Sequence, residues 1–293
     1  MELVVKMVFE ILSYTSILLI VVMGLAVVIS MMGVFNIAHS EFVLLGAYVV
    51  YIFEVWSFPI WLGILFAPFF VGYIGFLIEK VIIRRLYDNA IIGILATYAL
   101  AIVIRETVRA LLEGQAYSVA TSYGGSFKAF GLYFSIWQSV IIILTVVMIA
   151  SCYLIFTRTS VGLKVRGALD NPMLSRSSGI LTTQLYSYVF AFGSALAGLA
   201  GALVVPLYGI SADLGLLFLV QSFLSVMLGG VGGFIGPIFG GGVIGSSLSV
   251  FQWVRDLSGL DQFIAPVFVD VTVFAAALIV VKYRPNGIFS SKS

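Results

Sequence analysis

The chain has 293 residues, of which 61% are hydrophobic and only 10% are charged. Soluble domains average about 25% charged residues, so a chain this apolar cannot cover a surface that faces water. The formal net charge of +2, without a run of Lys or Arg, argues against a nucleic-acid partner. Composition therefore predicts an integral membrane protein.

The counts of cysteine and histidine limit the possible chemistry. The single cysteine, Cys152, excludes a disulfide within the chain, and one histidine with one cysteine argues against a resident metal site. The N-terminal residues MELVVKMVFEIL mix acidic with basic side chains and contain no small-residue cleavage site. We therefore expect no removable signal peptide.

Nine apolar segments follow one another along the chain, each a candidate for a membrane helix, which needs about 20 apolar residues. They cover residues 8–32, 36–54, 58–82, 91–111, 135–156, 184–207, 215–229, 237–254 and 264–282. Because 215–229 and 237–254 are short, we expect eight or nine spans. The predicted fold is all-α, a polytopic transmembrane helix bundle forming one domain over residues 1–293. Broken or re-entrant helices are expected near 33–40 and 229–237.

Basic residues gather in three places, which sets the expected orientation. These are Lys80, Arg84 and Arg85; Arg158, Lys164, Arg166 and Arg176; and Lys282, Arg284 and Lys292. Because Lys and Arg favour cytoplasmic loops, all three places are expected on the cytoplasmic side. The N-terminus then lies outside with nine spans and inside with eight. The segment from Arg105 to Ser135, which mixes charges with tyrosines and glycines, is expected to be an outside loop.

The most informative stretch of the sequence is MMGVFNIAHSEFVLLGAY, residues 31–48, where four polar residues stand between apolar runs. These residues are Asn36, His39, Ser40 and Glu41. Polar side chains at membrane depth cost several kcal/mol unless they face the bundle interior or a wet cavity. Two interpretations stay open: the residues line a path for solute, or they hydrogen-bond neighbouring helices to hold a kink.

The spacing of these four residues predicts that they do not all lie on one side of a helix. If Asn36 caps a half-helix that runs to about Glu54, then Asn36, His39 and Ser40 share one arc of about 100°. The first three could line a cavity at a helix N-terminus, whose partial positive charge suits a carboxylate. Glu41 points away from that arc and needs a partner of its own or a proton. A lone histidine is more often structural than a proton relay.

Glycines crowd the second half of the chain. Gly193, Ala197, Gly198 and Gly201 fall on one predicted helix and favour close helix packing. Further along, consecutive glycines followed by a proline predict a broken helix, with the proline beginning the next one. The candidate residues of this break, also candidates for the solute path, are Gly229, Gly230, Gly232, Gly233, Gly236 and Pro237. The segment 229–239 faintly echoes residues 32–42, as repeats in transporters do.

A polar segment between Thr157 and Ile180 is longer than a simple connection requires. Asp170 or Asn171 can cap a short helix there, Pro172 fits its first turn and Gly179 can end it. The basic residues alone would indicate an anchor on anionic lipid. The capped helix indicates a segment that another protein chain binds.

Four blocks of sequence, in order, resemble the permeases of branched-chain amino-acid ABC importers, a family that includes urea and short-amide permeases. They read NIAHSEFVLLGAY, RTSVGLKVRGALDNPMLSRSSGI, VMLGGVGGFIGPIFGGGVIG and RPNGIF, and the likeness runs from about Gly24 to Phe289. The resemblance implies a bacterial inner-membrane subunit that pairs with a second, related permease, two ATPase chains and a periplasmic solute-binding protein. It also implies that residues 157–180 form the segment coupled to the ATPase. The coupling candidates are Arg158, Gly162, Lys164, Arg166, Asn171, Pro172 and Gly179.

The chain lacks the motifs of an ATPase. No G-x-x-x-x-G-K-[ST] loop occurs, nor H-E-x-x-H or G-x-S-x-G, so we expect a transport subunit with no cofactor of its own, while ATP and Mg bind to partner chains. Branched-chain or related hydrophobic amino acids are the expected solutes, with urea or short amides as the alternative. A gradient-driven transporter or channel is the rival class, and an intramembrane enzyme using Glu41 and Asp270 is a further one.

Overall fold

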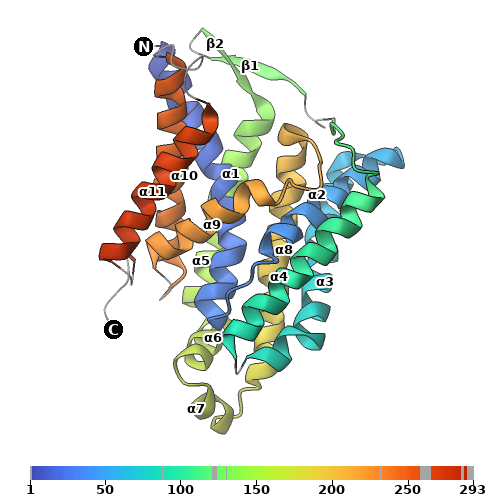
Figure 1. Cartoon of the computed structure of the whole chain (residues 1–293), viewed down its shortest axis with the longest axis vertical. Helices are drawn as coiled ribbons and strands as arrows, with labels where there is room; N and C mark the ends of the chain where they lie inside the picture. The colour runs from blue at the N-terminus through green and yellow to red at the C-terminus, as the bar shows by residue number, and fades with distance from the viewer. Residues whose placement is uncertain are drawn as a thin grey trace.

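The computed structural model describes residues 2–87, 89–120, 124–129, 131–230, 233–257, 265–284 and 287–288, and most of these residues are helical (Figure 1). The long helices are α1 (Glu2–Met32), α3 (Ile60–Val81), α4 (Ala90–Leu111), α5 (Ile136–Arg158), α8 (Thr182–Tyr208), α10 (Ile235–Leu257) and α11 (Pro266–Tyr283). The shorter ones are α2 (His39–Val55), η1 (Ile83–Leu86), α6 (Ser160–Asp170), α7 (Pro172–Ser177) and α9 (Leu216–Gly229). Strands β1 (Ser126–Ala129) and β2 (Leu132–Ser135) pair antiparallel.

The prediction of a polytopic helical bundle is confirmed. Among the described residues, seven helices are long and apolar enough to cross a membrane. With 14 residues, α9 extends about 21 Å and is too short to cross alone, as predicted. The prediction that residues 237–254 form a short segment is wrong, because α10 continues to Leu257 and has 23 residues.

Helix α8 occupies the centre of one half of the bundle, where it packs against α1, α2 and α3. Small residues make this possible. Gly201 lies against the backbone of Val43 in α2, and a Cβ built on Gly193 would stand only 2.8 Å from the carbonyl oxygen of Gly24 in α1. In lipid the hydrophobic effect does not drive helices together, so close van der Waals packing of this kind holds them in contact. The packing interpretation of this glycine-rich helix is confirmed.

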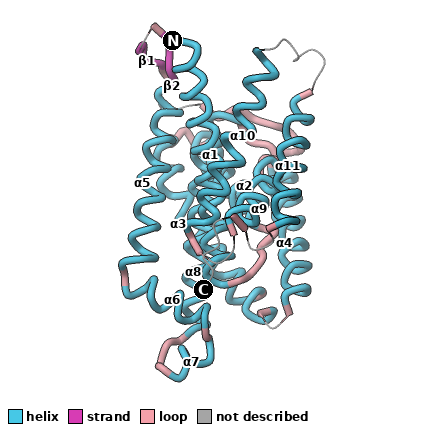
Figure 2. The backbone as a smooth tube through the Cα atoms, turned by 90° about the vertical axis from the view of Figure 1, so that its left-hand side faces the viewer, coloured by secondary structure: helices cyan, strands magenta, loops and turns pink. Residues whose placement is uncertain are grey.

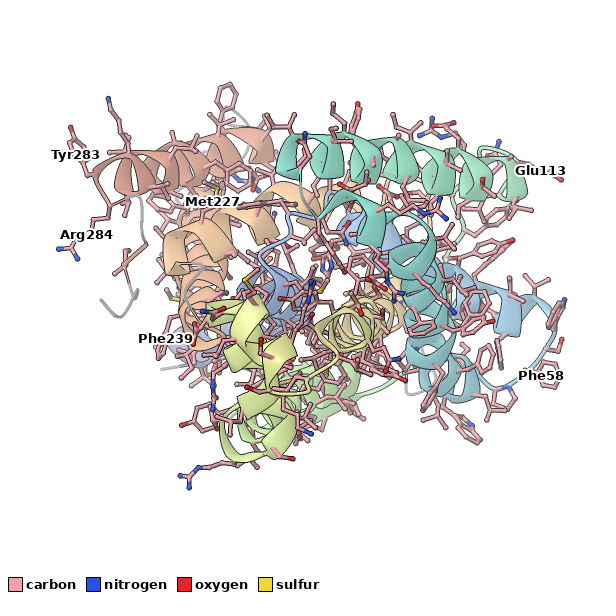
Figure 3. The ribbon with its side chains drawn as sticks, turned by 90° about the horizontal axis from the view of Figure 1, so that it is seen from below. Phe58, Glu113, Met227, Phe239, Tyr283 and Arg284 are labelled. Carbon is pink, nitrogen blue, oxygen red and sulfur yellow. The ribbon has the colours of Figure 1, made fainter. Side chains whose placement is uncertain are left out.

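Helix α1 joins the two halves of the bundle. It packs against α8 and α2 on one side and against α9 and α10 on the other, so its apolar residues enter both hydrophobic clusters of the core. Helices α3, α4, α5 and α11 lie further out and expose many large apolar side chains, as expected for surfaces that face lipid or another membrane chain. From below, α11 and α4 line one edge of the bundle, with Tyr283 and Glu113 near its two ends (Figure 3).

The two ends of the bundle differ in structure. Helices α6 and α7 project at one end, while the N-terminus of α1 and the β1–β2 hairpin lie at the other (Figure 2). The basic segments that follow α3 and α5 lie at the α6–α7 end, so the positive-inside rule places that end in the cytoplasm. This places the start of α1 on the outer side, while the expected count of eight or nine spans stays a prediction.

The expectation of an outside loop from Arg105 to Ser135 holds only in part. Helix α4 continues to Leu111, so Arg105, Glu106 and Arg109 are helical residues. The rest of the segment contains the hairpin, and an isolated backbone bridge joins Tyr117 to Ile210. The candidate span 91–111 ends where α4 ends, so the error lies only in starting the loop at Arg105, where charges within the last turns of a helix resemble a loop.

The close approach at Gly201 predicts opposite effects for two glycine substitutions. In Gly201→Ala the new methyl group meets the Val43 backbone, so we expect a loss of about 1–3 kcal/mol in stability from overpacking. Gly242→Ala in α10 is the matched control, since no atom lies within 4 Å of its Cβ position. There the gain in helix propensity should stabilise by about 0.5–1 kcal/mol. Thermal unfolding in detergent measures both, and a stable Gly201→Ala protein would contradict the packing described.

Candidate functional site

The first interruption in the bundle separates α1 from α2. Helix α1 ends at Met32, and Gly33 follows with φ +68°, a conformation that favours glycine. His39, the first residue of α2, donates through Nε2 to the carbonyl oxygen of Val21, 3.0 Å away. Val21 precedes Met32 by about 16 Å of helix, and the intervening linker can span about 20 Å. The linker therefore turns back into the bundle, and α2 begins at membrane depth.

Asn36 does not cap α2, contrary to the sequence interpretation. The cap position is Ala38, and no side chain caps this end of the helix. Asn36 lies in the linker, fully buried, and neither polar atom of its side chain has a partner among the described residues. The arc that Asn36, His39 and Ser40 were expected to share on one helix therefore does not exist, because the helix starts three residues later.

Glu41 has the partner that its position requires. Its carboxylate accepts hydrogen bonds from the guanidinium of Arg105 in α4 and from the hydroxyl of Ser40, the latter at 3.2 Å. The Glu41 side chain is completely buried, and that of Arg105 is 17% exposed. One carboxylate oxygen, Oε2, and the Nε of Arg105 have no partner among the residues described.

Sequence reasoning missed the role of Arg105, which fell both near the end of the candidate span 91–111 and at the start of the expected outside loop. The signal that could have found it is the four-residue spacing of Thr97, Ala101 and Arg105, which puts them on one face of α4. Thr97 and Ala101 on that face are buried, and the hydroxyl of Thr97 accepts the backbone N–H of Ile37 in the linker at 3.3 Å. Helix α4 thus contacts the first interruption twice, through Thr97 at the linker and through Arg105 at the start of α2.

The N-terminus of α9 meets that of α2. Gly215, at the cap position of α9, lies so close to the carbonyl group of Ser40 that no side chain would fit. One helical turn beyond Arg105, Arg109 forms ion pairs with Asp213 at 2.7 Å and with Glu106 at 3.2 Å. Two helix N-termini, each with a partial positive charge, therefore converge beside a cluster of carboxylates and guanidinium groups.

The second interruption separates α9 from α10. Helix α9 ends at Gly229, and Gly230 follows with φ +98°. The hydroxyl of Ser30 in α1 donates to the carbonyl oxygen of Gly233 at 3.0 Å, and the N–H of Ile288 donates to that of Leu228 at 2.8 Å. The predicted break is confirmed, and the C-terminal segment helps to close it.

The other glycines of the second interruption need separate mention. Gly236 and Pro237 are buried in the first turn of α10, which begins at Ile235 rather than at the proline. Gly232 lies outside the described residues. The two interruptions stand at opposite ends of α9, about 20 Å apart by its length. The structure therefore gathers His39, Ser40 and Glu41 with Arg105 but not with Gly229 and Gly230, and a continuous solute path through both stays a prediction.

The cytoplasmic segment folds as predicted, and of its two candidate caps Asn171 is the one used. Asn171 caps α7 by accepting the N–H of Leu174 at 2.9 Å, Pro172 is its first residue, and Gly179 follows it with φ +82°. Asp170, the alternative cap, is instead the last residue of α6.

Two other coupling candidates shape α6. Gly162 donates its N–H to the hydroxyl of Thr159, which caps α6, and Arg166 donates to the backbone carbonyl of Phe156. Arg158 and Lys164 are exposed. The four residues therefore divide between folding the segment and presenting charge at its surface.

A cavity of about 300 Å³ connects the cytoplasmic segment with the first interruption. Its lining includes Gly33, Val34 and Phe35 of the linker together with Pro172 and Arg176 of α7. A displacement of α7 would therefore change the surroundings of the linker that leads to His39.

A buried network fixes the loop between α3 and α4. Glu79, fully buried, accepts hydrogen bonds from the Tyr87 hydroxyl at 2.5 Å and from Arg84 at 3.3 Å. Arg84 also donates to the hydroxyl of Ser187 in α8 at 2.5 Å. Burial, together with the adjacent Glu79 carboxylate, raises the pKa of the Tyr87 phenol, which keeps it protonated as a donor. Nothing in the sequence indicates the contact between Arg84 and Ser187, which lie 103 positions apart.

Interrupted membrane helices, half-helix N-termini that meet inside the bundle and a short helix projecting on the cytoplasmic side are features of membrane transport proteins. Comparison with known sequences agrees. The family described as "Branched-chain amino acid transport system / permease component" matches residues 7–281. The chain therefore belongs to this family, and it is a transport subunit rather than an enzyme.

Relatives match over nearly their whole length. The high-affinity branched-chain amino acid transport system permease protein BraD of Pseudomonas aeruginosa is 25% identical, covering 92% of this chain and 90% of the relative. The probable branched-chain amino acid transport permease protein LivH of Methanocaldococcus jannaschii is 25% identical, covering 94% and 90%. LivH of Escherichia coli K12 is 23% identical, covering 92% and 89%. No solved structure matches the chain.

The Asn171 cap predicts a local change in hydrogen exchange. Asn171→Ala removes the acceptor for the Leu174 N–H, which costs about 1 kcal/mol of helix stability and should speed exchange in the first turn of α7 about fivefold. Asn171→Asp keeps an acceptor and is the control. Mass-spectrometric exchange over residues 172–178 measures the effect, and equal rates in the Ala variant and the wild type would show that the cap is dispensable.

Proposed function

We propose that this chain is the membrane-spanning permease subunit of an ATP-driven ABC importer for branched-chain or related hydrophobic amino acids in the bacterial inner membrane. Family membership over residues 7–281 carries the proposal. The names of the relatives BraD and LivH, both called branched-chain amino acid transport proteins, support the solute class. Because the sequence contains no G-x-x-x-x-G-K-[ST] loop, ATP binding and hydrolysis are proposed for another chain.

The proposed partners are a second, related permease, two ATPase chains that bind ATP and Mg, and a periplasmic solute-binding protein. Helix α7 is the proposed docking element for an ATPase. It projects beyond the rest of the bundle at the cytoplasmic end (Figure 2). Met173 and Leu174 of α7 are 81% and 64% exposed, and two large apolar side chains on a water-facing helix are suited to a groove in a partner protein.

The proposed mechanism is alternating access to a path through the bundle. An ATPase that closes on nucleotide can shift this equilibrium only if it contacts α7 differently in the two states. The cavity shared by α7 and residues 33–35 supports a mechanical link from this helix to the first interruption. Solute would pass Asn36, His39, Ser40 and Glu41 and leave by the glycine-rich interruption that begins at Gly229.

Transport by the reconstituted importer tests the proposal. Proteoliposomes that hold this chain with its ATPases, second permease and binding protein should accumulate radiolabelled leucine, isoleucine or valine only when ATP is enclosed. Uptake of urea in place of leucine would select the alternative solute class. Uptake without ATP that collapses with the proton gradient would overturn the importer and favour a gradient-driven transporter.

Docking through α7 predicts a surface variant that uncouples the complex. In Met173→Asp an exposed apolar contact becomes a charge, which at an interface anchor costs about 2 kcal/mol or more. We expect at least a tenfold fall in the ATPase that co-purifies, with normal membrane insertion. Tyr133→Asp on the outer hairpin, where Tyr133 is 71% exposed, is the matched control. Undiminished co-purification in Met173→Asp would remove α7 from the docking surface.

A further inference from the structure

The ion pair between Glu41 and Arg105 is buried in the bundle, yet some of its hydrogen-bonding atoms lack a partner among the described residues. Charges taken out of water usually saturate their hydrogen bonds, because each missing partner carries a desolvation cost. Here Glu41 is fully buried, yet among the described residues neither its Oε2 nor the buried Nε of Arg105 has a partner. In the linker that precedes α2, the side-chain amide of Asn36 is also buried, and the described part of the chain offers it no partner. The region therefore holds spare acceptors and donors of both kinds.

The helices around the pair add positive potential. The N-termini of α2 and α9 converge here, since Gly215 contacts the carbonyl group of Ser40. Each helix N-terminus carries roughly half a positive charge. The pair itself is neutral, so the surroundings favour an additional carboxylate while Glu41 supplies an acceptor for a cation.

An amino-acid zwitterion matches this arrangement. Its carboxylate suits the planar fork of a guanidinium, and its ammonium group suits a carboxylate acceptor. Insertion of a zwitterion between Glu41 and Arg105 would replace one ion pair by two, so neither buried charge loses its partner. Urea has no charge, and separating the pair around urea would leave both charges without compensation.

Charges further out extend the arrangement toward water. Arg109 lies four residues after Arg105 on the same face of α4, and it pairs with Asp213, whose side chain is 60% exposed. An exposed pair and a buried pair therefore follow each other along α4.

We propose that Glu41 and Arg105 form a binding site for the ammonium and carboxylate groups of an α-amino acid on its way through the bundle. This inference rests on the proposed transport function and deepens it. It makes Arg105 a residue that determines solute class and selects zwitterions against urea and short amides.

Uptake and ATP hydrolysis, measured on the same proteoliposomes of the complete importer, test the site. The double variant Glu41→Gln/Arg105→Gln keeps shape and removes both charges together, which avoids an isolated buried charge. We expect it to assemble and to hydrolyse ATP in response to the binding protein, with leucine uptake per ATP at least tenfold lower. Arg105→Lys, which retains the positive charge, should recover part of the uptake.

The control is the other buried ion pair of the chain's described part, Glu79 with Arg84. Glu79→Gln/Arg84→Gln should lower thermal stability and leave leucine uptake per ATP unchanged. Wild-type uptake per ATP in the Glu41/Arg105 double variant would overturn the site and leave the importer proposal intact. Failure of the wild-type importer to carry leucine would instead overturn the proposed function.

A measurement on the wild-type protein makes the test independent of how the variants fold. Thermal unfolding of the purified complex without binding protein is compared in millimolar L-leucine, isovalerate, isoamylamine and urea. Leucine should raise Tm more than isovalerate or isoamylamine, each of which carries only one of the two charges, and urea at the same low concentration should leave it unchanged. Equal effects of leucine and the singly charged analogues, or no effect of leucine, would contradict zwitterion binding.

Discussion

The constraint on which the structure depends is that backbone groups within a membrane must find hydrogen-bond partners inside the protein. Two helices are interrupted inside this bundle, and each interruption frees N–H and C=O groups that lipid cannot satisfy. The structure supplies partners from distant segments: Thr97 for Ile37, Ser30 for Gly233 and the N–H of Ile288 for Leu228. His39 in turn donates to the carbonyl oxygen of Val21, within α1, which holds the start of α2 against that helix. The interruptions persist because neighbouring helices are held against them.

Close helix packing makes this possible. The small residues of α8 let α1, α2 and α3 approach its backbone, which brings the start of α2 against the middle of α1. Helix α9 then spans the distance between the two interruptions, its N-terminus at Ser40 and its C-terminus near Ser30. The interrupted helices therefore depend on close packing. Short helices end at membrane depth and place their polar termini inside the bundle.

The same linker connects the interior with the cytoplasm. Residues 33–35 line the cavity next to α7, and six residues further on the chain reaches Ser40 and Glu41. A transport protein needs such a connection, because energy released at a cytoplasmic surface must change access to a site at membrane depth. The ion pair of Glu41 and Arg105 joins α2 to α4 just after this linker, so a movement of the linker would affect the pair.

The sequence by itself determined the membrane class, the helical fold, both interruptions and the capped helix at Asn171 and Pro172, because composition, glycine and proline act locally. It also required a partner for Glu41 without naming one. Only the tertiary structure decided that the partner is Arg105, 64 residues away, that Asn36 caps nothing, and that the two interruptions stand at opposite ends of α9. The physical reason is that an apolar pattern reports burial in lipid or protein alike, so it cannot say which helices are neighbours.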